Sequence, residues 1–302
     1  MEQSIVVFGD LNLDTSVSIG QFPLHEGDTL FSFDGISDAI GGAAANVAVG
    51  LTALGHQVHF GSVVGQDRMA ELVQQLAQAK GLATNSIRPD WPTTSRTVVL
   101  IDAAGNRQCI NDPKAVHRYR YPEAALPTLF EQSQWVYCST QNWCRYVAQA
   151  ARDAGSTVIV DVQALVDIDE YHRDFLQAAS IIILSTEQLA MHSHEFMRRL
   201  WQQFEIDIVV ATHGNHGATL GVRATNTIEY QPAFELGSVV DKTGAGDAFC
   251  AGFIAGLASD LTPRQALSFG QYVAASKIAI KGSTNGFPER THVLQALAQL
   301  PT

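Results

Sequence analysis

Residues 241–249 read Asp-Lys-Thr-Gly-Ala-Gly-Asp-Ala-Phe, a small-residue turn followed at once by a carboxylate and an apolar, helix-forming run. Gly244 and Gly246 allow tight backbone turns and let an anion approach the bare amides. The helix expected to begin near Gly246 adds the partial positive charge of its N-terminus. In that field Asp247 is expected to stay ionised and to serve as a base. The simpler interpretation of the same residues is a helix cap with a packing turn.

The 302-residue chain is long enough for one large α/β domain with an appendage or for two medium domains. Hydrophobic residues make up 46% and charged residues 16%, which excludes a disordered chain. The net charge of −11 argues against nucleic acid as a partner but leaves small anions open. The apolar runs are too short for a membrane span, and the first residues lack export features. We therefore expect a cytoplasmic protein without a membrane partner, in which the four scattered cysteines are reduced.

Short apolar runs alternate with helical patterns along most of the chain. Strands are expected at residues 5–8, 58–60, 135–138, 157–160, 181–184 and 208–211. Helices are expected at residues 43–54, 69–79, 146–154 and 196–204, followed by an almost wholly helical end from 246 to 298. Because the strands are apolar on both faces, the pattern predicts a mostly parallel central sheet with helices on each side.

Two segments interrupt this alternation. Residues 15–19 and 30–33, and residues 97–101 and 107–110, have the alternating pattern of short antiparallel strands joined by turns. They are either surface hairpins or a small sheet standing off the main body as a lid. We expect one domain over 1–302, with lid segments inserted at about 15–35 and 95–111. One face of the lid should be covered by substrate or by another subunit, and a homodimer through the lid is expected.

A second glycine-rich segment, Gly41-Gly42-Ala43-Ala44-Ala45-Asn46, opens the first long helix. The glycines permit close approach of a ligand, and Asn46 offers a donor and an acceptor to sugar hydroxyls. The competing interpretation is helix packing through small residues.

After the first strand, residues 9–14 place Asp14 at a strand end, where open α/β sheets bind ligands. The chain lacks the dinucleotide-binding and P-loop glycine patterns, which disfavours NAD enzymes and P-loop enzymes.

These two glycine-rich segments, in this order and about 200 residues apart, resemble the N-terminal and C-terminal signatures of the PfkB family of ribokinase-like carbohydrate kinases. The resemblance implies a ribokinase-like fold with a small antiparallel β lid. It also implies ATP-dependent phosphorylation of a hydroxyl on a small sugar. ATP and Mg²⁺ would be the cofactors, and the resemblance raises K⁺ as a third.

The resemblance also implies a role for each matching residue. Asp247 would be the base, and the amides of the turn would form the anion hole, namely those of Gly244, Ala245 and Gly246. The sugar would contact Asn12, Asp14, Gly41, Gly42 and Asn46. The nucleotide would lie against Ser185, Thr212, Gly214, Gly217 and Lys242. Glu187 would support magnesium, and Asp241 with Thr243 would lie at a monovalent cation.

The chain departs from the family pattern in three places. It reads Ser185-Thr186-Glu187-Gln188 where Asn-x-x-Glu is usual, and it has Lys242 where a small or hydroxylated residue is common. It also has Gln163 and Leu165 where some sugar-acid and fructose kinases show Asn and Arg, which disfavours a sugar acid. Two alternatives to a sugar kinase stay open: a nucleoside kinase on the same scaffold, and a non-catalytic sugar-binding regulatory protein.

Overall fold

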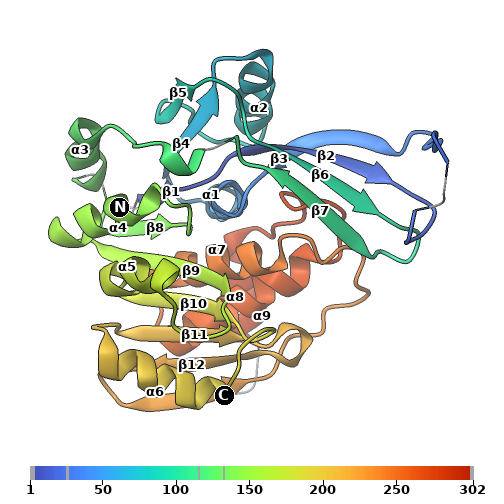
Figure 1. Cartoon of the computed structure of the whole chain (residues 1–302). Coiled ribbons are helices and arrows are strands. Elements are labelled where there is room, and N and C mark those ends of the chain that lie inside the picture. Colours follow the sequence, from blue (N-terminus) through green and yellow to red (C-terminus); the bar gives the residue numbers. More distant parts are fainter. Residues whose placement is uncertain (1–3, 25–26, 115, 132, 300–302) are drawn as a thin grey trace.

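The computed structural model describes residues 4–24, 27–114, 116–131 and 133–299, and a large twisted sheet runs through them (Figure 1). Neighbouring strands are parallel except at one edge, where an antiparallel hairpin is added. Within the described residues this sheet has nine strands. In order from that edge they are β13 (Thr227–Gln231), β12 (Ala218–Val222), β11 (Ile208–Thr212), β10 (Ile181–Ser185), β9 (Thr157–Ala164), β8 (Trp135–Cys138), β1 (Ile5–Phe8), β4 (Val58–Gly65) and β5 (Ile87–Trp91).

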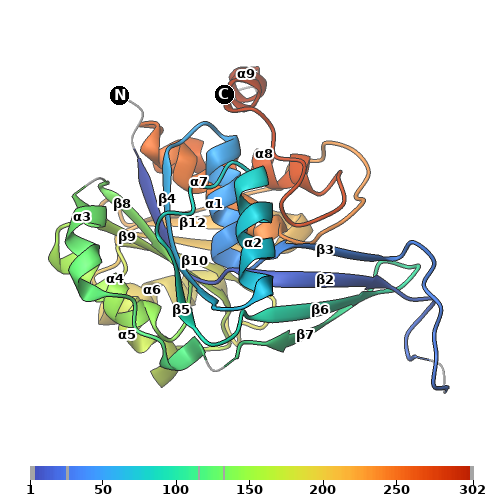
Figure 2. The same ribbon diagram turned by 90° about the horizontal axis from the view of Figure 1, so that it is seen from above.

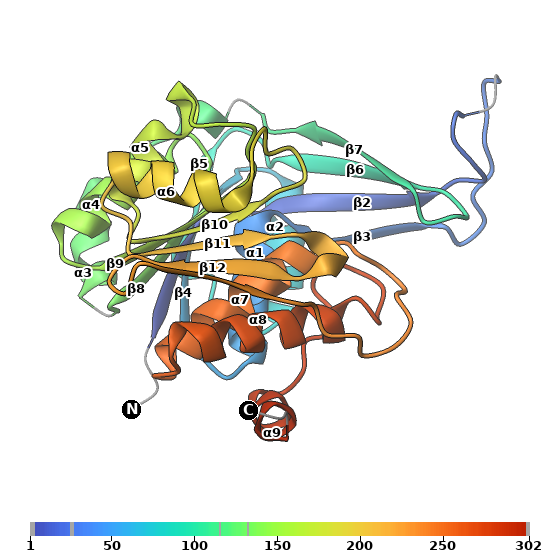
Figure 3. The same ribbon diagram turned by 90° about the horizontal axis from the view of Figure 1, so that it is seen from below.

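The sheet is covered by helices on both faces, because its central strands are apolar on both faces. In β1, Ile5 and Val7 belong to one hydrophobic core, and Val6 and Phe8 belong to the other. The first core is formed with α1 (Ala43–Ala53), α2 (Arg68–Ala79), α7 (Ala245–Ala258), α8 (Pro263–Lys277) and α9 (Arg290–Ala298). The second is formed with α3 (Leu126–Phe130), α4 (Cys144–Asp153), α5 (Glu170–Ala178) and α6 (Ser193–Gln203). Figure 3 shows β10, β11 and β12 between these two helical layers.

A second, four-stranded sheet extends away from the main body (Figure 2). Its two hairpins are antiparallel, and they are joined by a parallel pairing of β2 with β6. In order across the sheet, its strands are β3 (Ile36–Gly41), β2 (Asn12–Ser18), β6 (Arg96–Ile101) and β7 (Arg107–Asp112). The predicted fold class, a mostly parallel sheet with a small lid sheet, is confirmed.

The prediction of a lid strand at residues 30–33 is wrong, since the partner of β2 is β3. Register pairs Asn12 with Gly41 and Asp14 with Ala39, so the strand runs directly into the glycine-rich start of α1. Phe31 and Phe33 instead lie in a loop and are 80% and 87% exposed. An apolar run resembles a strand in sequence even where it has no sheet partner.

Other differences concern amphipathic or edge elements. The strands β5, β12 and β13 and the helix α5 were not predicted. All four are short, and β5, β13 and α5 are only partly buried, whereas β12 is almost wholly buried. The helical end of the chain consists of α7, α8 and α9, with a loop at residues 278–289. Within the described ranges, no helix combines the length and the apolar character that a membrane span requires.

Candidate active site

Close packing of α1 against α7 brings Asn46 to Asp247. A Cβ added at Gly50 would lie 2.6 Å from the Cβ of Ala251, so the two helices meet through small residues. Asn46 Nδ2 donates a hydrogen bond to Asp247 Oδ2 at 2.7 Å, between residues 201 positions apart in the chain. The buried Oδ1 of Asn46 has no hydrogen-bond partner among the described residues, so it is free to accept from a ligand.

The charge state of Asp247 differs from the prediction. Its pKa is raised to about 7: burial is the main cause, the neighbouring carboxylates of Asp161 and Asp10 add to it, and Asn46 and Arg107 oppose it. The expectation that the helix N-terminus keeps this carboxylate fully ionised is therefore wrong. Removing water from the carboxylate outweighs the helix field, and the side chain titrates close to neutral pH.

The turn before α7 leaves backbone amides available to an anion. Gly244 has a φ of 74°, and a Cβ at this position would lie 2.9 Å from the carbonyl oxygen of Ser283, so only glycine fits. The amide of Ala245 donates to the carbonyl of Lys242 at 3.1 Å. Among the described residues, no hydrogen bond is formed by the amides of Gly244 and Gly246. Two of the three predicted anion-hole amides are therefore free, and the third is used within the turn.

On the opposite side of the site, Asp14 of β2 lies over the backbone of Gly41. A Cβ at Gly41 would fall 1.9 Å from Asp14 Oδ2, which explains the need for glycine there. The pKa of Asp14 is raised to about 6: burial is the main cause, Thr97 opposes the shift, and the neighbouring Asp10 adds to it. Its Oδ1 atom is buried and accepts no hydrogen bond from any described residue, so it remains available to a hydroxyl.

These groups line one cavity of about 520 Å³ between the lid and α7, a size that suits a small ligand. The predicted site residues that meet in it are Asn12, Asp14, Gly42, Asn46, Thr243, Gly244 and Asp247. The lid contributes cationic and polar side chains that include Arg96, Thr97, Arg107 and Asn111. A carboxylate near its pKa, the free amide of Gly244 and hydroxyl-binding groups thus face the same cavity.

The model of the family described as "pfkB family carbohydrate kinase" matches residues 2–290 of the sequence. The chain belongs to this family. An acarbose 7(IV)-phosphotransferase of Actinoplanes sp. is 27% identical over 296 residues, which cover 97% of this chain and 98% of that protein.

Solved structures show the same fold for this pfkB family kinase. A microbiome-derived acarbose kinase superposes with a TM-score of 0.89 at 24% identity, covering 99% of this chain and all of that one. A ribokinase of Arabidopsis thaliana, complexed with ribose and ATP, superposes with a TM-score of 0.84 at 22% identity, covering 98% and 99% of the two chains. The ribokinase-like fold therefore extends over nearly the whole chain.

The residues predicted to contact the nucleotide do not line this cavity of the kinase. Ser185 and Thr212 are paired at the ends of β10 and β11. Gly217 has a φ of 118°, and a Cβ there would lie 2.1 Å from the carbonyl of Gln231. Gly214 begins the short 3₁₀ turn Gly214–His216, and Lys242 is exposed. Ser185 and Thr212 thus meet at one sheet edge, and Lys242 lies beside the turn of α7.

The predicted magnesium ligand Glu187 is exposed, and its amide donates to Ser185 Oγ at 3.3 Å. Across the described part of the chain, no group of three or more His, Cys, Asp or Glu side chains is placed to hold a metal ion. Because Mg²⁺ commonly binds through one or two carboxylates together with substrate phosphates, Glu187 fits such a role only in combination with phosphate oxygens.

Three polar residues near the site were not among the site residues predicted from the sequence. Asp10 accepts hydrogen bonds from the amides of Ala43 and Ala44 at 3.1 and 3.3 Å, and so fixes the start of α1. Arg107 of β7 donates to Thr243 Oγ1 at 2.9 Å, which connects the lid to the turn of α7. Lys277 is fully buried beneath that turn. For Arg107, the only signal in the sequence is its position on a predicted lid strand, and this position does not predict the contact with Thr243.

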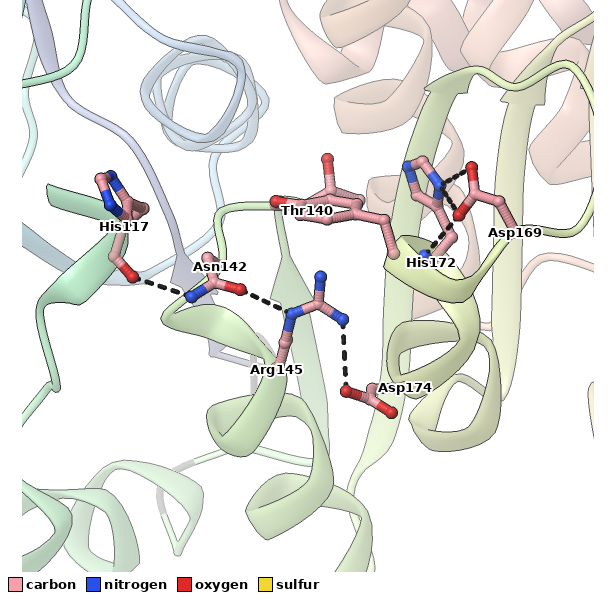
Figure 4. Close-up of polar contacts among 8 residues, drawn as sticks. His117, Thr140, Asn142, Arg145, Asp169, His172 and Asp174 are labelled. Atoms are coloured by element: carbon pink, nitrogen blue, oxygen red, sulfur yellow. Dashed lines mark hydrogen bonds and ion pairs between the residues drawn. The ribbon is translucent and has the colours of Figure 1, made fainter. Parts of the chain in front are cut away.

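A second cavity, of about 680 Å³, lies beyond Trp143, which lines both cavities. Asn142 donates to the carbonyl of His117 at 2.8 Å and accepts from Arg145 Nε at 2.8 Å, and Arg145 Nη1 lies 3.2 Å from Asp174 (Figure 4). These contacts hold the segment after β7 against α4 and α5.

Proposed function

We propose that this kinase transfers the terminal phosphoryl group of ATP to a hydroxyl of a small sugar bound between the lid and α7. The observation that carries this proposal is the Asn46–Asp247 pair, which faces the same cavity as Asp14 and the free amide of Gly244. The names of the relatives, an acarbose phosphotransferase and a ribokinase with bound ribose and ATP, support a sugar as acceptor.

Asp247 acts as the general base in this proposal. Its hydrogen bond to Asn46 fixes the orientation of the carboxylate, so that one oxygen is free to take the proton of the acceptor hydroxyl. A pKa of about 7 suits this task, because a base works best when its pKa lies near the operating pH. Asp14 and Asn12 would hold further hydroxyls and align the sugar, with Gly41 and Gly42 allowing close approach.

The charge on the transferred phosphoryl group would meet the amides of Gly244 and Gly246 and the guanidinium of Arg107. Phosphoryl transfer depends mainly on positioning and on preorganised positive charge.

The nucleotide would extend towards Ser185, Thr212, Gly214 and Gly217, with Lys242 near its phosphates. Magnesium, when bound near Glu187 and the phosphates, would neutralise their charge. The Arg107–Thr243 contact would keep the lid over the site and exclude water, a competing acceptor.

The test is an ADP-release assay with ATP and magnesium over ribose, fructose, acarbose, sugar phosphates and nucleosides. We expect turnover with at least one free sugar. Turnover with nucleosides alone would indicate a nucleoside kinase instead. A sugar that raises the melting temperature, with no ADP released from any acceptor, would indicate a non-catalytic sugar-binding protein.

The pH dependence should report the ionisation of Asp247. Since the base must be ionised and its pKa is about 7, kcat/KM should fall by about tenfold per pH unit below pH 7 and level off above it. The hydrogen bond from Asn46 lowers this pKa, so Asn46→Ala should move the midpoint to higher pH. A profile that is flat between pH 5 and pH 8 would contradict the assignment of Asp247 as base.

We also propose that two copies of the chain associate through the lid. The rings of Phe31 and Phe33 stack with centroids 5.9 Å apart, and both are largely exposed, as are Ile36 and Ile110. The Phe31→Ser/Phe33→Ser variant should lower the molar mass measured by light scattering from dimer to monomer. Val166→Ser, which alters an exposed apolar residue outside the lid, should leave it unchanged. A monomeric wild type at high concentration would refute the proposal.

A further inference from the structure

Lys277, the last residue of α8, is a buried cation directly beneath the phosphate-binding turn. Its exposed fraction is 0%. Its ammonium donates to the carbonyl oxygen of Thr243 and lies 3.4 Å from that of Asp241. A buried ammonium requires acceptors for its protons, and these two carbonyls supply them.

The surroundings of Lys277 carry negative charge. The Asp241 carboxylate accepts from the amides of Thr243 and Gly282, both at 2.8 Å. Burial would raise the pKa of Asp241, but these hydrogen bonds and the Lys277 charge hold it below its usual value. Burial likewise lowers the pKa of Lys277, an effect that Asp241 and Asp247 oppose. The Asp241 and Asp247 carboxylates thus lie near the ammonium, which places its positive charge close to the proposed base.

The same two residues, Asp241 and Thr243, are those that the family resemblance assigns to a monovalent cation. Such a cation is commonly coordinated by backbone carbonyl oxygens. In this chain the carbonyls of both residues face the Lys277 ammonium instead. Two positive charges do not share one set of carbonyls, so these residues do not fit a potassium ion.

We propose that the Lys277 ammonium takes the place of a monovalent cation beneath the turn, so that this kinase needs no added potassium. The proposal rests on the proposed phosphoryl transfer. The ammonium is a positioning group: it holds the carbonyls of Asp241 and Thr243, and it adds fixed positive charge behind the free amides of Gly244 and Gly246. Because the charge is covalently attached, no binding equilibrium with solution ions is required.

The first test measures the kcat of the wild type with its accepted sugar in tetramethylammonium buffer, with and without KCl at constant ionic strength. We expect the two values to agree within about twofold. Lys277→Ala should lose about 10²-fold in kcat without potassium and should regain part of it with KCl, since the truncated side chain leaves room for an ion. Lys277→Met, which fills the same space with apolar atoms, should lose activity without any rescue by KCl.

Lys281→Ala, a matched change at an exposed lysine four residues further on, should behave as the wild type. Melting temperature gives a readout independent of catalysis: KCl should raise that of Lys277→Ala and leave those of the wild type and Lys277→Met unchanged. A wild type whose kcat falls more than about tenfold without potassium, or whose melting temperature rises with it, would overturn the inference. Full potassium-free activity of Lys277→Ala would do the same. If no sugar is phosphorylated, the proposed function fails, and the melting temperatures still decide the question of the cation.

Discussion

Replacing Asp247 by asparagine should lower kcat by about 10²- to 10⁴-fold, the range expected when a general base is removed. The amide has almost the same shape and still accepts the hydrogen bond from Asn46 Nδ2, so the site geometry should persist. What is lost is the ability to take a proton from the acceptor hydroxyl. The measurement is steady-state ADP release with the sugar that the wild type accepts.

The melting temperature of Asp247→Asn distinguishes loss of the base from misfolding. The pKa of Asp247 in the folded protein is about 7, above its usual value, so the folded state binds more protons than the unfolded state in the interval between the two values. The contribution of Asp247 to stability therefore decreases as the pH rises through 7. An asparagine carries no charge, so Asp247→Asn should melt no lower than the wild type at pH 8.

Asp260→Asn provides the matched control, because Asp260 is an exposed aspartate just beyond the other end of α7. It should retain the kcat of the wild type within about twofold. Retention of near-wild-type turnover by Asp247→Asn would remove this carboxylate from the mechanism. Equal losses in both variants would point to a general effect on the helix.

Replacing Arg107 by alanine should lower kcat by about 10²-fold, the loss typical of removing one preorganised group that meets developing charge. The guanidinium reaches from β7 of the lid to Thr243 Oγ1, next to the free amide of Gly244. Arg107→Lys should recover only part of the rate, because an ammonium cannot reproduce the planar fork of donors. The readout is the division of the effect between kcat and KM.

Arg96 serves as the internal control for this prediction. It lines the same cavity from the lid, but its guanidinium bonds to Thr15 within the lid, at 3.2 Å, and not to the turn of α7. Arg96→Ala should therefore change KM for the sugar more than kcat. If Arg107→Ala also changes KM alone, Arg107 is a sugar contact and has no part in stabilising the transferred phosphoryl group.

Much of the fold was accessible from local sequence patterns. The apolar runs that became β1, β8, β10 and β11 are buried on both faces, so their composition alone predicts a covered parallel sheet. Polar and edge elements such as α5 and β13 were missed because their residues resemble those of loops. The lid strand was misplaced because residues 30–33 are apolar without being paired, whereas β3 pairs through its backbone.

The candidate active site also combines features that were predictable from the sequence with features that were not. The sequence determined by itself that residues 241–247 form a glycine turn with a carboxylate and that Gly41 and Gly42 precede a helix, because these are local requirements of backbone conformation and close approach. Only the tertiary structure decided which groups meet. The Asn46–Asp247 hydrogen bond, the Arg107–Thr243 contact and the burial of Lys277 all join distant parts of the chain. The ionisation of Asp247 was likewise decided there, because desolvation depends on every neighbour that excludes water and not on the residues adjacent in sequence.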